Sequence, residues 1–209
     1  HRRSVYETIR RNAERILGLI NQMMDLRKID KGQMQMHMRE TNLVSFINDI
    51  YTLFAQQAKN KNILFHFDCD QERIMAWIDR GNFDKIIINI LSNAFKFTPT
   101  GGEIRITLTT NEKEASISIF DNGEKIPEDK LERIFERFYQ TPSSANDRNI
   151  GTGIGLDLTR SLVELHHGSI EARNNADGPG CEFTVTIPLG NEHLTPEEMV
   201  TNEVEEEET

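Results

Sequence analysis

The stretch FDKIIINILSNAFKFT, residues 83–98, decides the fold. Its apolar residues recur every three or four positions, which predicts an amphipathic helix with one buried stripe. The stripe comprises Ile86, Ile87, Ile90, Leu91, Ala94 and Phe95. Asn89, Asn93 and Lys96 share the opposite face, where two amides and an ammonium can hold a metal ion and phosphate oxygens. Such a polar face is also typical of a helix that simply faces solvent.

The composition indicates a soluble globular protein. Of 209 residues, 37% are hydrophobic and 28% are charged. The last 19 residues carry eight acidic side chains and no Lys or Arg, so the rest of the chain has a net charge of −2 rather than −10. This near balance argues against a nucleic-acid partner. No apolar run approaches the roughly 20 residues of a membrane span.

Cysteine usage and targeting signals point to the cytoplasm. Cys69 and Cys181 lack the close spacing of a zinc site, and a disulfide is not indicated. The sequence has no N-glycosylation sequon and no signal-peptide pattern, so a reducing compartment is expected. A membrane-anchored parent protein remains compatible with this pattern.

Residues 4–30 predict a long helix whose apolar side is too wide for a two-stranded coiled coil. One helix cannot bury this stripe by itself, so we expect it to pack on another helix, on a second copy of the chain, or on its own domain. The stripe comprises Ile9, Ala13, Ile16, Leu17, Ile20, Met23 and Met24.

The rest of the chain predicts an α+β two-layer sandwich, with helices on one layer and a mixed, mostly antiparallel sheet on the other. Further helices are expected after the Thr41-Asn42 cap, over 126–138 and over 153–168. Strands are expected at 63–68, 73–78, 103–110, 115–121, 169–175 and 181–189. Residues 31–41 form a connector, 42–190 the main domain, and 191–209 an acidic linker or frayed helix.

Three further motifs carry chemistry. Asp121-Asn122-Gly123 ends a strand, and its carboxylate can accept a hydrogen bond from an exocyclic amine, although a simple turn has the same sequence. FERFYQ (135–140) leads into a polar loop of unusual length, 140–153. GTGIGL (151–156) places three glycines before a helix, where backbone N–H groups can approach an anion.

These motifs carry a family resemblance over about residues 42–190. NILSNAFKFT resembles the N box, DNGEKIP the first glycine box, FERFYQ the F box and GTGIGL the second glycine box of sensor histidine kinases. Order and separations agree with that family, and the resemblance implies its Bergerat-type ATP-binding fold. Residues 1–30 look like the second helix of the dimerisation and phosphotransfer hairpin, most similar to that of hybrid sensors, with 191–209 leading towards a receiver domain.

The resemblance implies roles for individual residues in binding ATP and Mg²⁺. Asn93 would coordinate the metal, and Asn89 and Lys96 would hold and neutralise phosphate oxygens as the catalytic side chains. Asp121 would read the adenine amine, and the loop 140–152 would be a lid. The remaining residues of the implied ATP site are Phe97, Gly123, Lys125, Ile126, Phe138, Gly151, Thr152, Gly153, Ile154, Gly155 and Leu156.

The sequence departs from the family at two places. Lys125 stands where the first glycine box has its second glycine, which is expected to weaken nucleotide binding. No histidine lies in the family's phosphoacceptor context, and His1 lacks it, so the acceptor is expected outside this chain. The chain should therefore bind ATP without phosphorylating itself.

Three readings of the function follow. The first is the ATP-binding part of a histidine kinase, homodimeric through residues 1–30, acting with a receiver domain in two-component signalling. The second is a nucleotide-binding regulatory module with weakened or lost kinase activity, which Lys125 favours. The third is a serine-directed relative, against which the hairpin-like helix argues.

Overall fold

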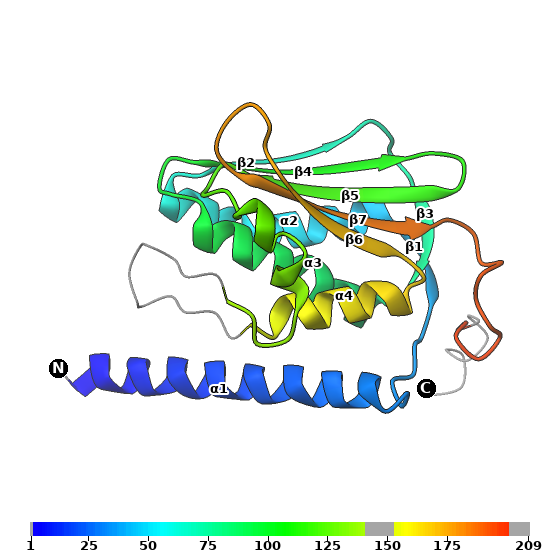
Figure 1. Ribbon diagram of the computed structural model, residues 1–209, viewed down its shortest axis with the longest axis horizontal. Helices are drawn as coiled ribbons and strands as arrows, with labels where there is room; N and C mark the ends of the chain where they lie inside the picture. Colours follow the sequence, from blue (N-terminus) through cyan, green and yellow to red (C-terminus); the bar gives the residue numbers. More distant parts are fainter. Residues whose placement is uncertain (1, 141–152, 201–209) are drawn as a thin grey trace, which may run out of the picture.

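The computed structural model describes residues 2–140 and 153–200, and it has the two layers that the sequence predicts (Figure 1). Helices α2, α3 and α4 cover one face of the sheet, and α1 lies beyond them. The helices are α1 (Arg2–Asp30), α2 (Leu43–Lys61), α3 (Arg80–Phe97) and α4 (Gly155–Leu165). The strands are β1 (Arg39–Asn42), β2 (Leu64–Cys69), β3 (Met75–Ile78), β4 (Glu103–Thr110), β5 (Glu114–Asp121), β6 (Ser169–Asn174) and β7 (Cys181–Pro188).

The main sheet has the order β2-β4-β5-β7-β6, and only the β2–β4 pair is parallel. This confirms the mixed, mostly antiparallel sheet and the β4–β5 hairpin. Its inner positions are apolar, for example Ile104 and Ile117, both fully buried. On the outer face, Ser118 pairs with Thr184 through their hydroxyl groups at 2.9 Å. One face therefore builds the core and the other tolerates water.

The α3 helix runs through the centre of the core. All six residues of its predicted apolar stripe are buried, and Phe95 packs against the rings of Phe54 and Phe65. Asp79 begins the helix, because its carboxylate accepts a hydrogen bond from the Asn82 N–H at 3.1 Å. The apolar side therefore packs α3 against the core, and the polar side of the helix faces away from the core.

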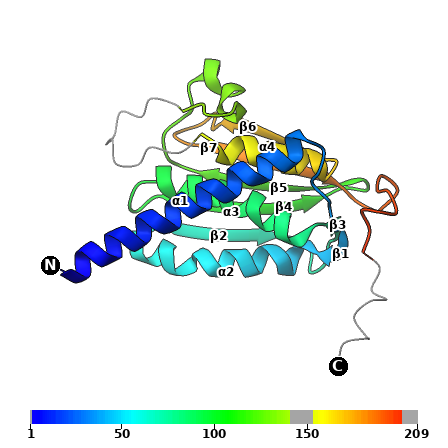
Figure 2. The same ribbon diagram turned by 90° about the horizontal axis from the view of Figure 1, so that it is seen from below.

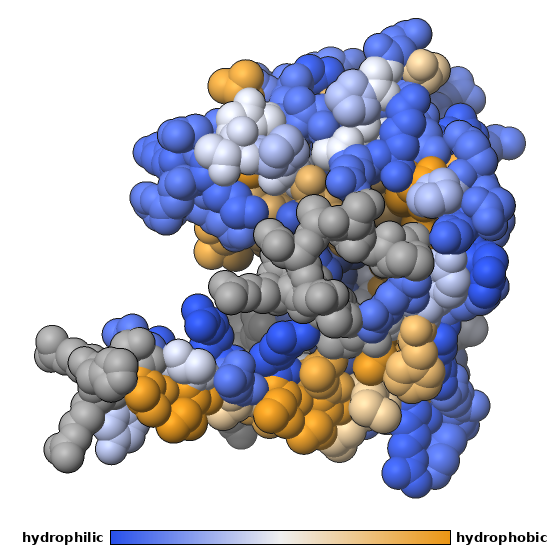
Figure 3. Space-filling model, turned by 60° about the vertical axis from the view of Figure 1, so that its left-hand side comes forward, coloured by the Kyte–Doolittle hydropathy of each residue, from blue (hydrophilic) through white to orange (hydrophobic). Residues whose placement is uncertain are grey.

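The α1 helix crosses the helical layer and contacts the domain through its C-terminal half (Figure 2). Leu26 is buried, and Asp25 forms an ion pair with Lys85 of α3 at 2.7 Å. The predicted apolar stripe faces away, since Ile9 and Ile16 are each 58% exposed. Figure 3 shows apolar side chains gathered along this helix. The alternative prediction, in which the stripe packs on its own domain, is therefore wrong for these residues.

Membrane crossing can be judged for the described part of the chain. Within residues 2–140 and 153–200, no helix combines the length and apolar character that a bilayer span requires.

The prediction of a helix over residues 126–138 is wrong. The segment forms two short 3-10 turns, η1 (Glu128–Lys130) and η2 (Arg133–Phe135). Asn174 holds the backbone of Ile126 at one end, and Phe138 adopts a positive φ of 64° at the other. Only Ile134 and Phe135 are buried, so the segment lacks the apolar stripe that would stabilise a continuous helix.

The chain after Gly190 differs from the free linker that its composition predicts. Residues 191–200 fold back on the domain, and Leu194 is 9% exposed. The segment Arg39–Asn42 was expected within a connector and a helix cap, yet it forms β1, paired antiparallel with β3. Residues 201–209 lie outside the described part of the chain.

Candidate functional site

The polar side of α3 carries the three side chains singled out in the sequence. Asn89, Asn93 and Lys96 are all half-buried. Asn89 donates from Nδ2 to the Gly155 carbonyl and to Oγ1 of Thr159, both at 3.3 Å, which links α3 to the start of α4. Burial and the nearby Arg15 of α1 lower the pKa of Lys96. An anion at this position would offset both effects.

Asp121 lies at the end of β5, next to the C-terminal end of α3. Its Oδ1 accepts a hydrogen bond from the Gly123 N–H at 2.9 Å, and its Oδ2 accepts one from the Cys181 thiol at 3.5 Å. Burial raises the pKa of this carboxyl group, and both hydrogen bonds oppose the shift. A Cβ at Gly123 would lie 2.6 Å from the Phe97 carbonyl oxygen, so only glycine allows this turn to approach α3.

The described part of the second glycine box lies at the other end of the same face. Gly153 has a φ of 68°, and its carbonyl accepts a hydrogen bond from the Phe138 N–H at 2.8 Å. Gly155 begins α4 beside Asn89. No side chain in the described residues caps this helix. Its N-terminal turn can therefore offer backbone donors and a favourable partial charge to an anion.

These contacts join the motifs into one continuous wall along α3. Gly123, which binds Asp121, approaches its end at Phe97; Lys96 and Asn93 follow along the helix, and Asn89 contacts Gly155. One end presents a buried carboxylate, which recognises a hydrogen-bond donor. The other end presents amides, an ammonium and a helix N-terminus, which suit an anion. The arrangement matches a ligand with a polar base and several phosphates.

The comparisons with known proteins agree with this geometry. A family model described as "Histidine kinase-, DNA gyrase B-, and HSP90-like ATPase" matches residues 78–191. The chain belongs to this ATPase family. The histidine kinase P4 of Formosa agariphila is 36% identical over 197 residues, which cover 93% of this chain and 14% of that protein. This chain therefore spans a small part of such relatives.

Solved structures show the same ATPase fold. The nucleotide-free catalytic domain of the histidine kinase ThkA is 32% identical, with a TM-score of 0.66 over 74% of this chain and 97% of that chain. ThkA in complex with the response regulator protein TrrA is 27% identical, with a TM-score of 0.68 over 86% of this chain and 50% of that one. These likenesses confirm the predicted fold and family.

The other residues that were predicted to bind the ligand differ in how far they are exposed. Phe97 is 42% exposed and lies under the Lys96 ammonium, 4.9 Å from it. Phe138 and Lys125 are exposed, and Ile126 is half-buried. Ile154 is 4% exposed and belongs to the core, and its carbonyl accepts a hydrogen bond from the Leu158 N–H at 3.0 Å, so its side chain does not face a ligand.

The remaining positions lie at or beyond the edge of the described residues. Leu156 is half-buried in the first turn of α4. Gly151, Thr152 and the rest of the proposed lid up to residue 152 lie outside the described residues, except for Gln140 at its start.

Three residues that the sequence did not assign to the candidate site hold its members in place. Asn174 of β6 binds both the N–H and the carbonyl of Ile126, at 2.9 and 2.6 Å, and so fixes the chain after the first glycine box. Cys181 holds Asp121. Gly180 has a φ of 101°, and a Cβ there would lie 1.8 Å from the Asp121 carbonyl. The Gly178-Pro179-Gly180 run signals a turn, but no local pattern reveals the partners.

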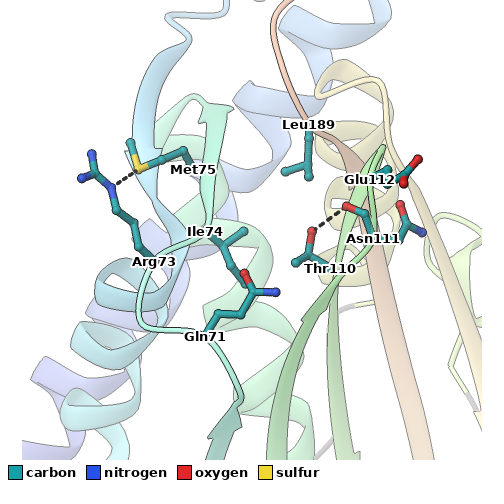
Figure 4. A pocket seen from close by; sticks show the side chains of 8 residues that line it. All are labelled: Gln71, Arg73, Ile74, Met75, Thr110, Asn111, Glu112 and Leu189. Carbon is teal, nitrogen blue, oxygen red and sulfur yellow. Dashed lines mark hydrogen bonds between the residues drawn. The ribbon is translucent and has the colours of Figure 1, made fainter.

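A separate hollow of about 420 Å³ lies elsewhere on the ATPase domain (Figure 4). It is lined by Arg73, Met75, Thr110 and Leu189, among others. Thr110 is at the end of β4, whereas Asp121 pairs with Ile104 near its beginning. Six residues of strand separate the two, about 20 Å at 3.3 Å per residue, so the hollow is distinct from the candidate site.

Proposed function

We propose that this ATPase domain binds ATP with Mg²⁺ and donates the γ-phosphoryl group to a histidine of a dimerisation hairpin, for relay to an aspartate of a receiver domain. One observation carries this proposal above the others. The wall along α3 joins a buried carboxylate to an anion-binding helix start through two amides and an ammonium. Such a wall fits the base at one end of a nucleotide and the phosphates at the other.

Recognition of the base would depend on Asp121. Its two oxygens accept hydrogen bonds from the Gly123 N–H and the Cys181 thiol, and each carboxylate oxygen retains a second lone pair. The exocyclic amine of adenine is a donor, whereas the oxygen of guanine at that position is an acceptor. Asp121 would therefore select adenine over guanine.

The phosphates would lie between Lys96 and the start of α4. Lys96 would neutralise charge, and the N–H groups near Gly155 would donate to oxygens. The Asn89 amide already donates to the Gly155 carbonyl and to the Thr159 hydroxyl, so it would hold the glycine turn in place, and donating to a phosphate would require it to release one of these bonds. Phosphoryl transfer requires chiefly this positioning and charge neutralisation.

The donor set also fits Mg²⁺. Asn93 is half-buried one helical turn from Asn89, and its amide oxygen is a hard ligand. In the described residues, no group of three or more His, Cys, Asp or Glu could hold a metal ion. A cation there would take its other ligands from phosphates and water, which is the usual arrangement for Mg²⁺ in nucleotide sites. When bound, the ion supplies charge neutralisation at the transferred group.

The partners follow from the same proposal. The uncovered stripe of α1 would pair with a second copy of the chain and with the other helix of the hairpin. A receiver domain, in the same chain or on a separate response regulator, would accept the phosphoryl group. The whole protein would act in the cytoplasm, on the inner side of a membrane if the parent protein is anchored.

A nucleotide titration tests the site. ATP with Mg²⁺ should bind the unchanged chain, GTP should bind far more weakly, and Asp121→Asn should weaken ATP binding by at least about tenfold, because a charge-assisted hydrogen bond is lost. Asp177→Asn, an exposed carboxyl in the β6–β7 turn, is the matched control. Equal binding of ATP by Asp121→Asn would refute the assignment.

Phosphoryl transfer separates the kinase from a regulatory module. Labelled ATP should give no acid-labile label on this chain alone, and it should label a histidine-bearing hairpin supplied in trans. Binding of ATP without any transfer to the hairpin would favour the regulatory module with lost kinase activity.

A further inference from the structure

Residues 191–200 begin where the match to the ATPase family ends, at residue 191. They nevertheless bind the connector that joins α1 to the domain. The Met38 N–H donates to the Glu198 carbonyl at 2.6 Å, and the Val200 N–H donates to the Met38 carbonyl at 2.9 Å. Met38 and Met199 thereby form a parallel β-bridge.

Side chains around this bridge form a second, separate core. Met38 is fully buried, and Met36 and Leu194 are 5% and 9% exposed. Trp77 of β3 and Met199 pack against them. Apolar burial of this kind is what distinguishes a docked segment from a tail that merely lies on the surface.

Glu198 fixes the turn that presents this segment. Its Oε2 accepts a hydrogen bond from the Thr195 N–H at 2.8 Å, and its Oε1 lies 3.3 Å from Nε2 of His167, just after α4. Glu197, its neighbour, is exposed. Two adjacent glutamates therefore differ sharply in their contacts.

The opposite side of the connector is also fastened. The His37 N–H donates to Oδ2 of Asp79, the residue that caps α3, at 3.0 Å. The connector is thus held between the domain on one side and residues 191–200 on the other. The ion pairs of α1 with Lys85 and Arg137 are partly exposed, and such pairs contribute little by themselves.

We infer that residues 191–200 form a strap that locks the connector and so fixes the angle at which α1 leaves the ATPase domain. The strap makes the direction of α1 depend on a segment more than 150 residues later in the sequence. A force on the strap, or a molecule that competes for its apolar side chains, would free α1 to change its angle to the domain. The nucleotide site would stay unchanged. This inference does not rest on the proposed function.

A distance measurement in the full chain tests the strap. Nitroxide labels at Asn21→Cys in α1 and Glu112→Cys in the β4–β5 turn report the angle of α1, since both positions are exposed. Cys69→Ser removes one native thiol. Cys181 stays, because it is buried and burial raises the pKa of its thiol, which keeps it unreactive.

The variants are Glu198→Ala and Leu194→Ala, with Glu197→Ala as the control. Both strap variants should about double the width of the distance distribution, because the connector then opens locally, and Glu197→Ala should leave it unchanged. ATP affinity should stay within about twofold in every chain, because the changes lie far from the α3 wall.

Three outcomes overturn the strap. The first is an unchanged distribution in Glu198→Ala and Leu194→Ala, which would mean that α1 is held by its own contacts. The second is equal broadening by Glu197→Ala. The third is broadening accompanied by a matching loss of ATP affinity, which would mean that the segment stabilises the whole domain. If Leu194→Ala fails to fold, Glu198→Ala decides, because it removes no core side chain.

Discussion

Arg137 and Asp30, 107 positions apart in the sequence, form a two-pronged ion pair in which Nη1 and Nη2 reach the two carboxylate oxygens at 2.8 and 3.0 Å. The same guanidinium donates from Nε to Asp157 at 2.6 Å. Arg137 also adjoins Phe138, which binds Gly153. One side chain therefore ties the end of α1 to the first turn of α4 and to the glycine turn.

We expect this ion pair to be visible in the titration of the Asp30 carboxyl group. Hydrogen bonds from Arg137 lower the pKa of Asp30 below its usual value, burial opposes this shift, and the charge of Arg137 adds to the lowering. A carboxyl group with a lowered folded-state pKa stabilises at pH values above its unfolded pKa of about 3.9, and the contribution is lost as pH falls through the folded value. In Arg137→Gln, NMR titration of Asp30 should show a pKa back near the usual value.

Arg133→Gln is the control for this titration, since Arg133 pairs with Glu136 and not with Asp30. An Asp30 pKa that stays low in Arg137→Gln would contradict the assignment.

A second prediction concerns His166, which is 2% exposed. Its Nδ1 lies 2.7 Å from the Leu162 carbonyl and its Nε2 accepts from the Asp79 N–H at 3.2 Å, so both nitrogens are satisfied by the neutral ring. Burial lowers the pKa of His166, although Leu162 and Asp79 oppose this shift. The unfolded chain then binds more protons, so the stabilisation is complete above pH of about 6.5 and falls as pH decreases below it.

Urea unfolding between pH 5 and pH 7.5 measures how the free energy of unfolding depends on pH. One extra proton bound by the unfolded chain changes the free energy of unfolding by at most about 1.4 kcal/mol per pH unit. His166→Gln should remove the contribution of His166 to this pH dependence. His66→Gln, at an exposed position on β2, should retain it. An unaltered slope in His166→Gln would show that other groups dominate.

A third prediction concerns Gly180, the residue that allows Asp121 to sit where it does. Gly180→Ala combines a positive φ with a collision at 1.8 Å, so we expect a loss of about 3 kcal/mol or more in the free energy of unfolding. Gly190→Ala is the matched control, because Gly190 also has a positive φ, 75°, but no atom lies within 4 Å of its Cβ. It should cost about 1 kcal/mol. Equal costs in the two chains would mean that the close approach is unimportant.

A fourth prediction addresses Lys125, which replaces a glycine of the family's first box. Its side chain is exposed, next to Ile126, whose backbone is fixed by Asn174. Lys125→Gly should bind ATP more tightly in calorimetric titration, because the loop regains the freedom to approach the nucleotide. Lys113→Gly, in the β4–β5 turn, should bind like the unchanged chain. Equal or weaker binding by Lys125→Gly would indicate that the ammonium contacts a phosphate.

The elements with strong periodicity were predictable from the sequence. The apolar stripe of α3 spans six buried residues, and β4 and β5 alternate regularly, so local pattern and tertiary burial coincide. Asn89, Asp121 and Gly155 could be named as candidate site residues because each belongs to a dense motif, and their roles in binding stay a prediction. The approach of Gly123 to Phe97, however, could not be predicted from a local pattern, because the two residues belong to different parts of the fold.

The elements that the sequence missed depend on partners distant in the chain. The β1 strand is only Arg-Glu-Thr-Asn, with one buried residue, and it exists because β3 pairs with it. The 3-10 turns replace a helix because Asn174 and Gly153 fix the backbone near the two ends of the segment. Leu194 and Met199 follow no helical or strand period, so the strap carries no local signal.

The apolar stripe of α1 has a consequence for how stability is measured. Ile9, Ile16 and Leu17 are each close to 60% exposed in a single copy of the chain. If self-association covers this surface, mass action makes the melting temperature rise with protein concentration. We expect dilution alone to lower it and a small amount of mild detergent, which also covers apolar surface, to abolish that dependence.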